Sequence, residues 1–96
     1  MRYFHRTSVA PDTVLAEADR FFGISLRPAD SAERRRSLAG TVGKVMEKVE
    51  REGGHYVRVT VETDQVGESE LDKLAKRFLA LVHRHAEPGY ELRGSY

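Results

Sequence analysis

The apolar pattern between residues 71 and 82 is the feature that most constrains the fold of this chain. Its members recur at the spacing of one helix face; they are Leu71, Leu74, Ala75, Phe78, Leu81 and Val82. Before this pattern, Val57, Val59 and Val61 alternate with polar residues, which predicts a strand with one buried and one solvated face. A one-sided helix and a one-sided strand each need an apolar partner, so we expect at least two layers.

Residue types that favour helix ends predict two helices, and an alternating pattern predicts a first strand. Ser69 and Asp72 have the spacing of a capping pair at the start of the last helix, and Pro88-Gly89 follows its end. A shorter amphipathic helix is predicted over residues 11–22, because proline suits a first helical turn and glycine follows the apolar repeat. Residues 2–9 alternate in the manner of a strand.

The segment between these elements has two interpretations. Apolar residues over 38–49 fit a helix, but Gly40 and Gly43 would each cost that helix about 1 kcal/mol relative to alanine. The glycines favour the alternative, in which the strands are 24–27, 34–41 and 42–50, with a polar turn at 28–31. Gly53-Gly54 then closes a hairpin onto a strand from His55 to Thr63.

The predicted fold is therefore an α+β two-layer sandwich in the order β-α-β(4)-α. An antiparallel sheet packs against a long C-terminal helix, and the shorter first helix lies on the same face. The chain has 96 residues, a length that supports a single domain with one compact core, and we expect one domain over residues 1–96.

Composition excludes several function classes. The chain contains no cysteine, which excludes a disulfide scaffold, a zinc knuckle, an iron–sulfur cluster and a thiol nucleophile. Sixteen basic and fifteen acidic residues produce no overall field that would attract nucleic acid or acidic membrane. Neither a secretion signal nor a membrane-spanning segment is evident, so we expect a cytoplasmic protein without a membrane span.

Arginine supplies twelve of the sixteen basic residues, asparagine is absent, and glutamine occurs once. Depletion of thermolabile side chains is typical of a thermophile. A GC-rich genome produces the same arginine bias, and both explanations stay open.

The chain resembles the START-like helix-grip proteins, also called the SRPBCC or polyketide-cyclase-like group, over about residues 2 to 86. The matching segments are Ala10-Pro11-Asp12-Thr13-Val14, the strand pair from Gly40-Thr41-Val42-Gly43 to Gly54-His55-Tyr56-Val57-Arg58-Val59, and Leu74-Ala75-Lys76-Arg77-Phe78-Leu79. The resemblance implies a curved sheet that wraps the last helix, with a small apolar or lipid-like ligand in the gap between them. The chain is a shortened form, with fewer strands than a full helix grip.

Glu47 is the most informative single residue if residues 42–50 form a strand. It shares a face with Val45 and Val49, so the face toward the helices holds either this carboxylate or Lys44 and Lys48. A carboxylate among valines would have its ionised form disfavoured by desolvation and could serve as an acid, a base or a ligand anchor. The alternatives are a strand end outside the core or a salt bridge to Arg58.

The candidate ligand-binding residues lie between the predicted sheet and the last helix. They are Glu47, Val57, Val59, Val61, Phe78 and His85. We expect no metal site, because His83 and His85 point about 200° apart on a helix and cannot easily share one ion. Helix capping accounts for Ser69 and the acidic residues around it without a metal. No phosphate loop, nucleophile elbow or H-E-x-x-H motif occurs, so an enzyme assignment has no support and we expect neither catalytic residues nor a cofactor.

Arg34-Arg35-Arg36 is the only basic run. Guanidinium groups pair with oxyanions in a bidentate fork, so the run could hold a phosphate. We favour a solvated edge strand, because charged side chains on an edge protect a sheet against aggregation.

Three functions follow, in order of preference. The first is a START-like module that binds a small apolar ligand without transforming it. The second is a homodimer whose interior is filled by side chains, because a small core gains from an oligomeric interface. The third is a KH-like RNA-binding domain, in which Gly40-Thr41-Val42-Gly43 would be the G-x-x-G loop between two helices. Nucleic acid is the least favoured partner, since Thr41 and Val42 carry no charge.

Overall fold

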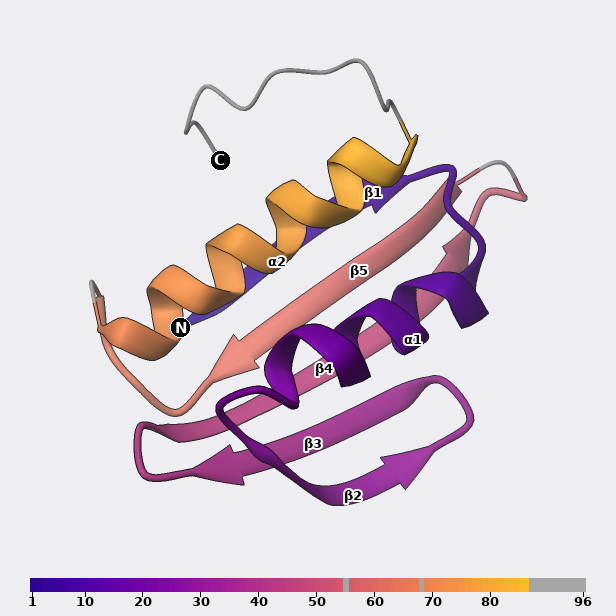
Figure 1. The fold of residues 1–96 in the computed structure, drawn as a ribbon. Coiled ribbons are helices and arrows are strands. Elements are labelled where there is room, and N and C mark those ends of the chain that lie inside the picture. Colours follow the sequence, from indigo (N-terminus) through magenta and orange to yellow (C-terminus); the bar gives the residue numbers. More distant parts are fainter. Residues whose placement is uncertain (55, 68, 87–96) are drawn as a thin grey trace.

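A computed structural model describes residues 1–54, 56–67 and 69–86. The elements are β1 (Arg2–Thr7), α1 (Pro11–Phe22), β2 (Arg27–Ala32), β3 (Arg35–Gly40), β4 (Gly43–Glu52), β5 (Tyr56–Thr63) and α2 (Glu70–Ala86). The strands form one antiparallel sheet in the order β1-β5-β4-β3-β2, and both helices cover the same face (Figure 1). The predicted α+β class with an antiparallel sheet is confirmed.

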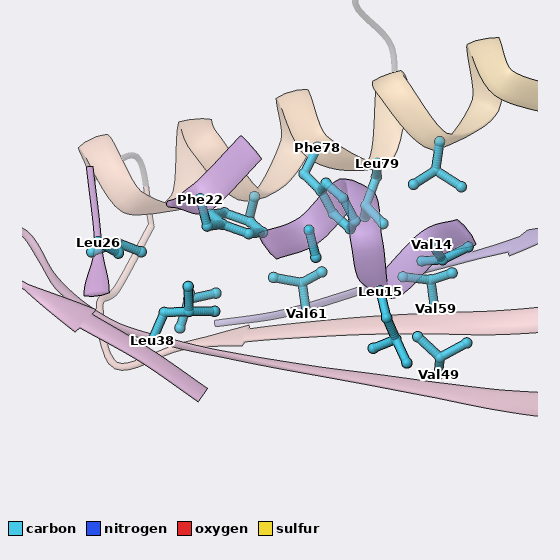
Figure 2. Packing of buried hydrophobic residues seen from close by; sticks show 14 of the residues in the cluster. Val14, Leu15, Phe22, Leu26, Leu38, Val49, Val59, Val61, Phe78 and Leu79 are labelled. Atoms are coloured by element: carbon cyan, nitrogen blue, oxygen red, sulfur yellow. The ribbon is translucent and has the colours of Figure 1, made fainter. Parts of the chain in front are cut away.

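Each helix covers a different part of the sheet. The α2 helix lies over β1 and β5, whereas α1 lies over β4 and β3 (Figure 1). Between the layers, Val49, Val59 and Val61 rise from the strands toward the helices (Figure 2). The rings of Phe22 and Phe78 meet there with centroids 5.2 Å apart. This arrangement buries the apolar face of each helix and leaves the opposite face of the sheet solvated.

The helix signals in the sequence are confirmed. The α1 helix spans the predicted residues and begins with Pro11. Before α2, the Ser69 hydroxyl accepts a 3.1 Å bond from the backbone N–H of Asp72 and donates a 2.6 Å bond to the Asp72 carboxylate. The predicted stop at Pro88-Gly89 lies outside the described residues.

Residues 38–40 and 43–50 lie in β3 and β4, with a turn at 41–42, so the helical interpretation of this segment is wrong. Gly40 and Gly43 are paired across the turn between β3 and β4 rather than placed between two helices. The KH-like interpretation therefore lacks the helices that it requires.

The predicted boundaries around β2 are also wrong. Residues 28–31, expected as a turn, belong to β2, and the turn lies instead at residues 23–25. Every residue of β2 is exposed, so the strand has no apolar alternation to reveal it. It is an edge strand with a register shift between Pro28 and Asp30, positions at which proline is tolerated. The edge of the sheet is therefore β2. The strand that contains Arg35, which was expected at the edge, lies between β2 and β4.

Gly43 is required by both its backbone and its surroundings. Its φ is +129°, and a Cβ atom there would lie 2.6 Å from Asp64 Oδ1 and 2.7 Å from Gln65 Nε2. Gly53 also has a positive φ, +64°, but a Cβ there would meet open space. Gly43 therefore combines a more strained φ with steric crowding, whereas Gly53 has only the milder strain of the left-handed region.

We predict that Gly43→Ala lowers the free energy of unfolding by about 3 kcal/mol and Gly53→Ala by about 1 kcal/mol. Both alanines are strained by positive φ, but only the first also collides with the loop after β5. Urea denaturation of the two variants measures the difference. Equal losses would contradict the additional strain and crowding assigned to Gly43.

Candidate functional site

Glu47 lies in the middle of β4 and points into the core. Its registered neighbours are Arg36 on β3 and Val61 on β5, and its side chain is 0% exposed. Both alternatives considered for this residue are therefore wrong. Glu47 is not at a strand end, and Arg58 lies opposite Glu50 in the β4–β5 register, on the solvated face, where its guanidinium lies 4.5 Å above the Phe4 ring.

The carboxyl group of Glu47 is not compensated by hydrogen bonds. Neither of its oxygens has a hydrogen-bond partner among the described residues. Burial, and secondarily the nearby Asp19 carboxylate, raise the pKa of Glu47 from 4.5 to about 9, while Arg36 opposes the rise. Glu47 is therefore a neutral carboxylic acid at pH 7.

Arg36 does not neutralise Glu47 because it is already engaged elsewhere. Its Nε lies 3.2 Å and 3.3 Å from the two carboxylate oxygens of Asp19 on α1. Its Nη1 donates to the backbone oxygens of Ala32, at 2.7 Å, and Arg35, at 3.0 Å. Together Asp19, Arg36 and protonated Glu47 carry no net charge. We call these three residues the Glu47 cluster.

The Glu47 cluster was only partly accessible to sequence reasoning. The sequence pattern identifies Glu47, but it predicts Arg36 on a solvated edge and gives no indication of Asp19. The signal for Arg36 was present, because a turn that pairs Gly40 with Gly43 also places Arg36 opposite Glu47 in an unbroken antiparallel register. Asp19 gave no signal, because an acidic residue on a short amphipathic helix is ordinary.

The other candidate ligand-binding residues are divided between two places. Val57, Val59, Val61 and Phe78 are all buried in the apolar cluster between the sheet and the helices. His85 lies apart, in the last turn of α2, with its Nε2 3.0 Å from Glu17 Oε1 on α1. The structure therefore brings Glu47 together with the apolar residues and gives His85 a contact between the helices.

Asp72 provides a contrast within the same molecule. It is also 0% exposed, but its carboxylate accepts hydrogen bonds from Tyr3 at 3.0 Å, Thr63 at 2.8 Å and Ser69 at 2.6 Å. Burial alone would raise the pKa of Asp72, but these three bonds outweigh it and lower that pKa. Asp72 thus joins β1, β5 and α2 as a satisfied structural carboxylate, which Glu47 is not.

The histidines do not form a metal site in the described part of the chain. His5 on β1 faces His83 on α2 with ring centroids 5.4 Å apart. Burial, followed by the proximity of His83, lowers the pKa of His5. Over residues 1–54, 56–67 and 69–86, no group of three or more histidines or carboxylates is arranged to hold a metal ion.

A hollow of about 430 Å³ is lined mainly by residues of β3, β4 and β5, among them the buried Leu38 and Val45 as well as outward-facing residues. Its lining includes Ser37, Met46 and Glu62, which alternate with the inward-facing residues of those strands. None of the six candidate ligand-binding residues lines this hollow. It is therefore separate from the Glu47 cluster.

Comparison with protein-family models and with curated proteins gives no match for this chain. No helix in the described ranges is both long enough and apolar enough to span a bilayer.

We predict that the stability of the protein falls as pH rises from about 5 to about 9. The folded pKa of Glu47 is raised, so in this window the folded state holds a proton that the unfolded chain has released. One such group reduces the free energy of unfolding by up to ~1.4 kcal/mol per pH unit. Urea denaturation across this pH range measures the slope.

Two variants assign the slope to Glu47. Glu47→Gln cannot ionise and should lose most of the decline with pH. Glu50→Gln makes the same change at an exposed position on the same strand and should keep it. Equal slopes in the wild type and Glu47→Gln would contradict the assignment.

Proposed function

We propose that this chain is a START-like domain that binds a small, mainly apolar ligand without transforming it, with Glu47 as the polar anchor. The observation that carries the proposal is the fully buried Glu47 carboxyl group, whose two oxygens have no hydrogen-bond partner in the described chain. The β-α-β(4)-α order and the two helices on one face of the sheet support the START-like assignment.

The energetic argument starts from the cost of Glu47. A buried polar group without hydrogen bonds costs about 1–3 kcal/mol, and an apolar residue of similar size would avoid that cost. A ligand that hydrogen-bonds to Glu47 recovers this energy in the bound state only. The carboxyl group of Glu47 thus destabilises the fold but contributes binding energy when a ligand hydrogen-bonds to it.

The charge of the Glu47 cluster selects the head group of the ligand. A protonated carboxyl group offers one O–H donor and one carbonyl acceptor. The Arg36 charge is balanced by Asp19, so the cluster leaves no net charge to attract an ion. A neutral alcohol or amide head with a short apolar body is the best match.

We infer that a ligand would approach Glu47 between α1 and β3. The side chains of Arg36 and Asp19, which join these two elements, are 25% and 48% exposed, whereas Glu47 behind them is 0% exposed. Valines and phenylalanines fill the space beneath the helices. A ligand must therefore be small and must displace the Arg36–Asp19 pair to reach the carboxyl group.

We predict that wild-type protein binds octan-1-ol and octanamide more tightly than octanoate. Binding should shift the backbone amide NMR signals of α1, β3 and β4. Glu47→Leu should weaken the binding of octanamide by about tenfold, the value of one hydrogen bond to a buried partner. Glu50→Leu, an outward-facing control on the same strand, should bind as the wild type does.

Equal octanamide binding by Glu47→Leu and wild type would reject Glu47 as the anchor. Absence of any shift in α1, β3 and β4 with all three probes would reject the binding function itself. Native mass spectrometry of freshly purified protein adds a check for a co-purified ligand.

The filled interior favours a second candidate, a homodimer. Sixteen apolar side chains in the described part of the chain form one buried cluster between the sheet and the helices. A domain whose gap is filled in this way can act through its outer surface instead. Sedimentation equilibrium distinguishes the candidates, because a monomer at all micromolar concentrations would eliminate the homodimer.

A further inference from the structure

Four exposed apolar side chains of the described chain gather at one end of the molecule. Met1 precedes β1, Ile24 lies between α1 and β2, Val42 in the β3–β4 turn, and Val66 between β5 and α2. All four segments lie at the left-hand end in Figure 1. We call these four residues the apolar tip.

Backbone contacts hold the segments of the tip together. The N–H of Thr63 donates to the carbonyl of Met1 at 2.8 Å, and the N–H of Asp64 donates to the carbonyl of Lys44 at 3.1 Å. A Cβ atom on Gly40 would lie only 3.0 Å from the carbonyl oxygen of Ser25. The tip is therefore a defined surface at the end of the sheet.

The shape of the tip does not suit a second copy of the chain. Ile24 and Val66 are 86% and 88% exposed, so each projects alone from its own loop. Protein interfaces are packed as densely as protein interiors, and stable ones bury about 800 Å² per partner. Five strands about 4.8 Å apart beneath one helical layer present an end of roughly 500 Å². The surface of a lipid bilayer is fluid, so it accommodates separate projecting side chains without a matching shape.

Charges beside the tip are of both signs. Arg2 pairs with Glu62 at 2.7 Å, and Lys73 pairs with Glu70 at 3.8 Å. Asp64 accepts a 2.9 Å bond from the backbone N–H of Lys44. A mixed border of this kind is not attracted to a strongly anionic surface. It is compatible with zwitterionic head groups, which also carry both signs.

We propose that the apolar tip docks the protein on a zwitterionic phospholipid surface, with Ile24 and Val66 inserted at the boundary between head groups and acyl chains. Insertion at this depth removes apolar side chains from water without spanning the bilayer. The proposal stands on exposed residues at the end of the sheet and is independent of ligand binding at Glu47.

Single tryptophans test the proposal directly, because the chain has none of its own. Ile24→Trp and Val66→Trp place the reporter on the tip. Tyr56→Trp is the control, since Tyr56 is also exposed but begins β5 at the opposite end. With phosphatidylcholine vesicles, we expect emission to move to shorter wavelength for both tip reporters and to stay unchanged for the control.

Vesicle flotation measures the contribution of the natural residues. The double variant Ile24→Asp/Val66→Asp should reduce the vesicle-bound fraction at least about tenfold, whereas Tyr56→Asp should not. Circular dichroism establishes that each variant is folded. These substitutions lie outside the core, so loss of folding is not the expected cause.

Three results would overturn the proposal. One is unchanged emission from both tip reporters in the presence of vesicles. Another is an equal shift from the Tyr56→Trp control, which would show non-specific adsorption. The third is a shift that depends on protein concentration without vesicles, which would assign the tip to a second copy of the chain.

Discussion

The register of the β3–β4 hairpin determines which side chains the core receives. Gly43 adopts a φ of +129° that only glycine tolerates, and it pairs with Gly40. From this turn the ladder continues without a shift, so Leu38 meets Val45 and Arg36 meets Glu47. A slip of one residue would turn the valines of β4 to solvent and bring its lysines inward. The valines enforce the register, and Glu47 is buried with them.

The burial of Glu47 explains the distribution of charge beneath α1. Two carboxylates, Asp19 and Glu47, lie near one guanidinium, that of Arg36. Asp19 is about half exposed and forms the ion pair with Arg36. Glu47, which is fully buried, keeps its proton instead. The cluster is therefore neutral as a whole, and its unsatisfied hydrogen bonds are confined to one acid group.

Sequence reasoning succeeded where an element has one apolar face. The repeats in α1 and α2 and the valines of β5 identified those elements, because burial on one side leaves a period that can be read. It failed at β2, whose six residues are all exposed and therefore carry no period. The sequence also does not decide whether the Glu47 side chain points into the core, because both faces of β4 carry apolar residues. Met46 lies on one face, and Val45 and Val49 lie on the other. Only pairing with β3 and β5 decides between them.

Two features of this molecule are not explained by folding alone, and α1 connects them. One is a buried polar group, Glu47, and the other is a set of exposed apolar groups at the tip. A carboxyl group is usually found in water and apolar side chains are usually buried, so both features place a group outside its usual environment.

The α1 helix contributes Asp19 to the Glu47 cluster and ends at Phe22, after which Ile24 projects at the tip. Leu26, two residues after Ile24, is buried, and its backbone N–H donates to the carbonyl of Phe22 at 2.8 Å, so the loop is tied to the end of the helix. The same helix therefore positions both Asp19 in the Glu47 cluster and the loop that carries Ile24.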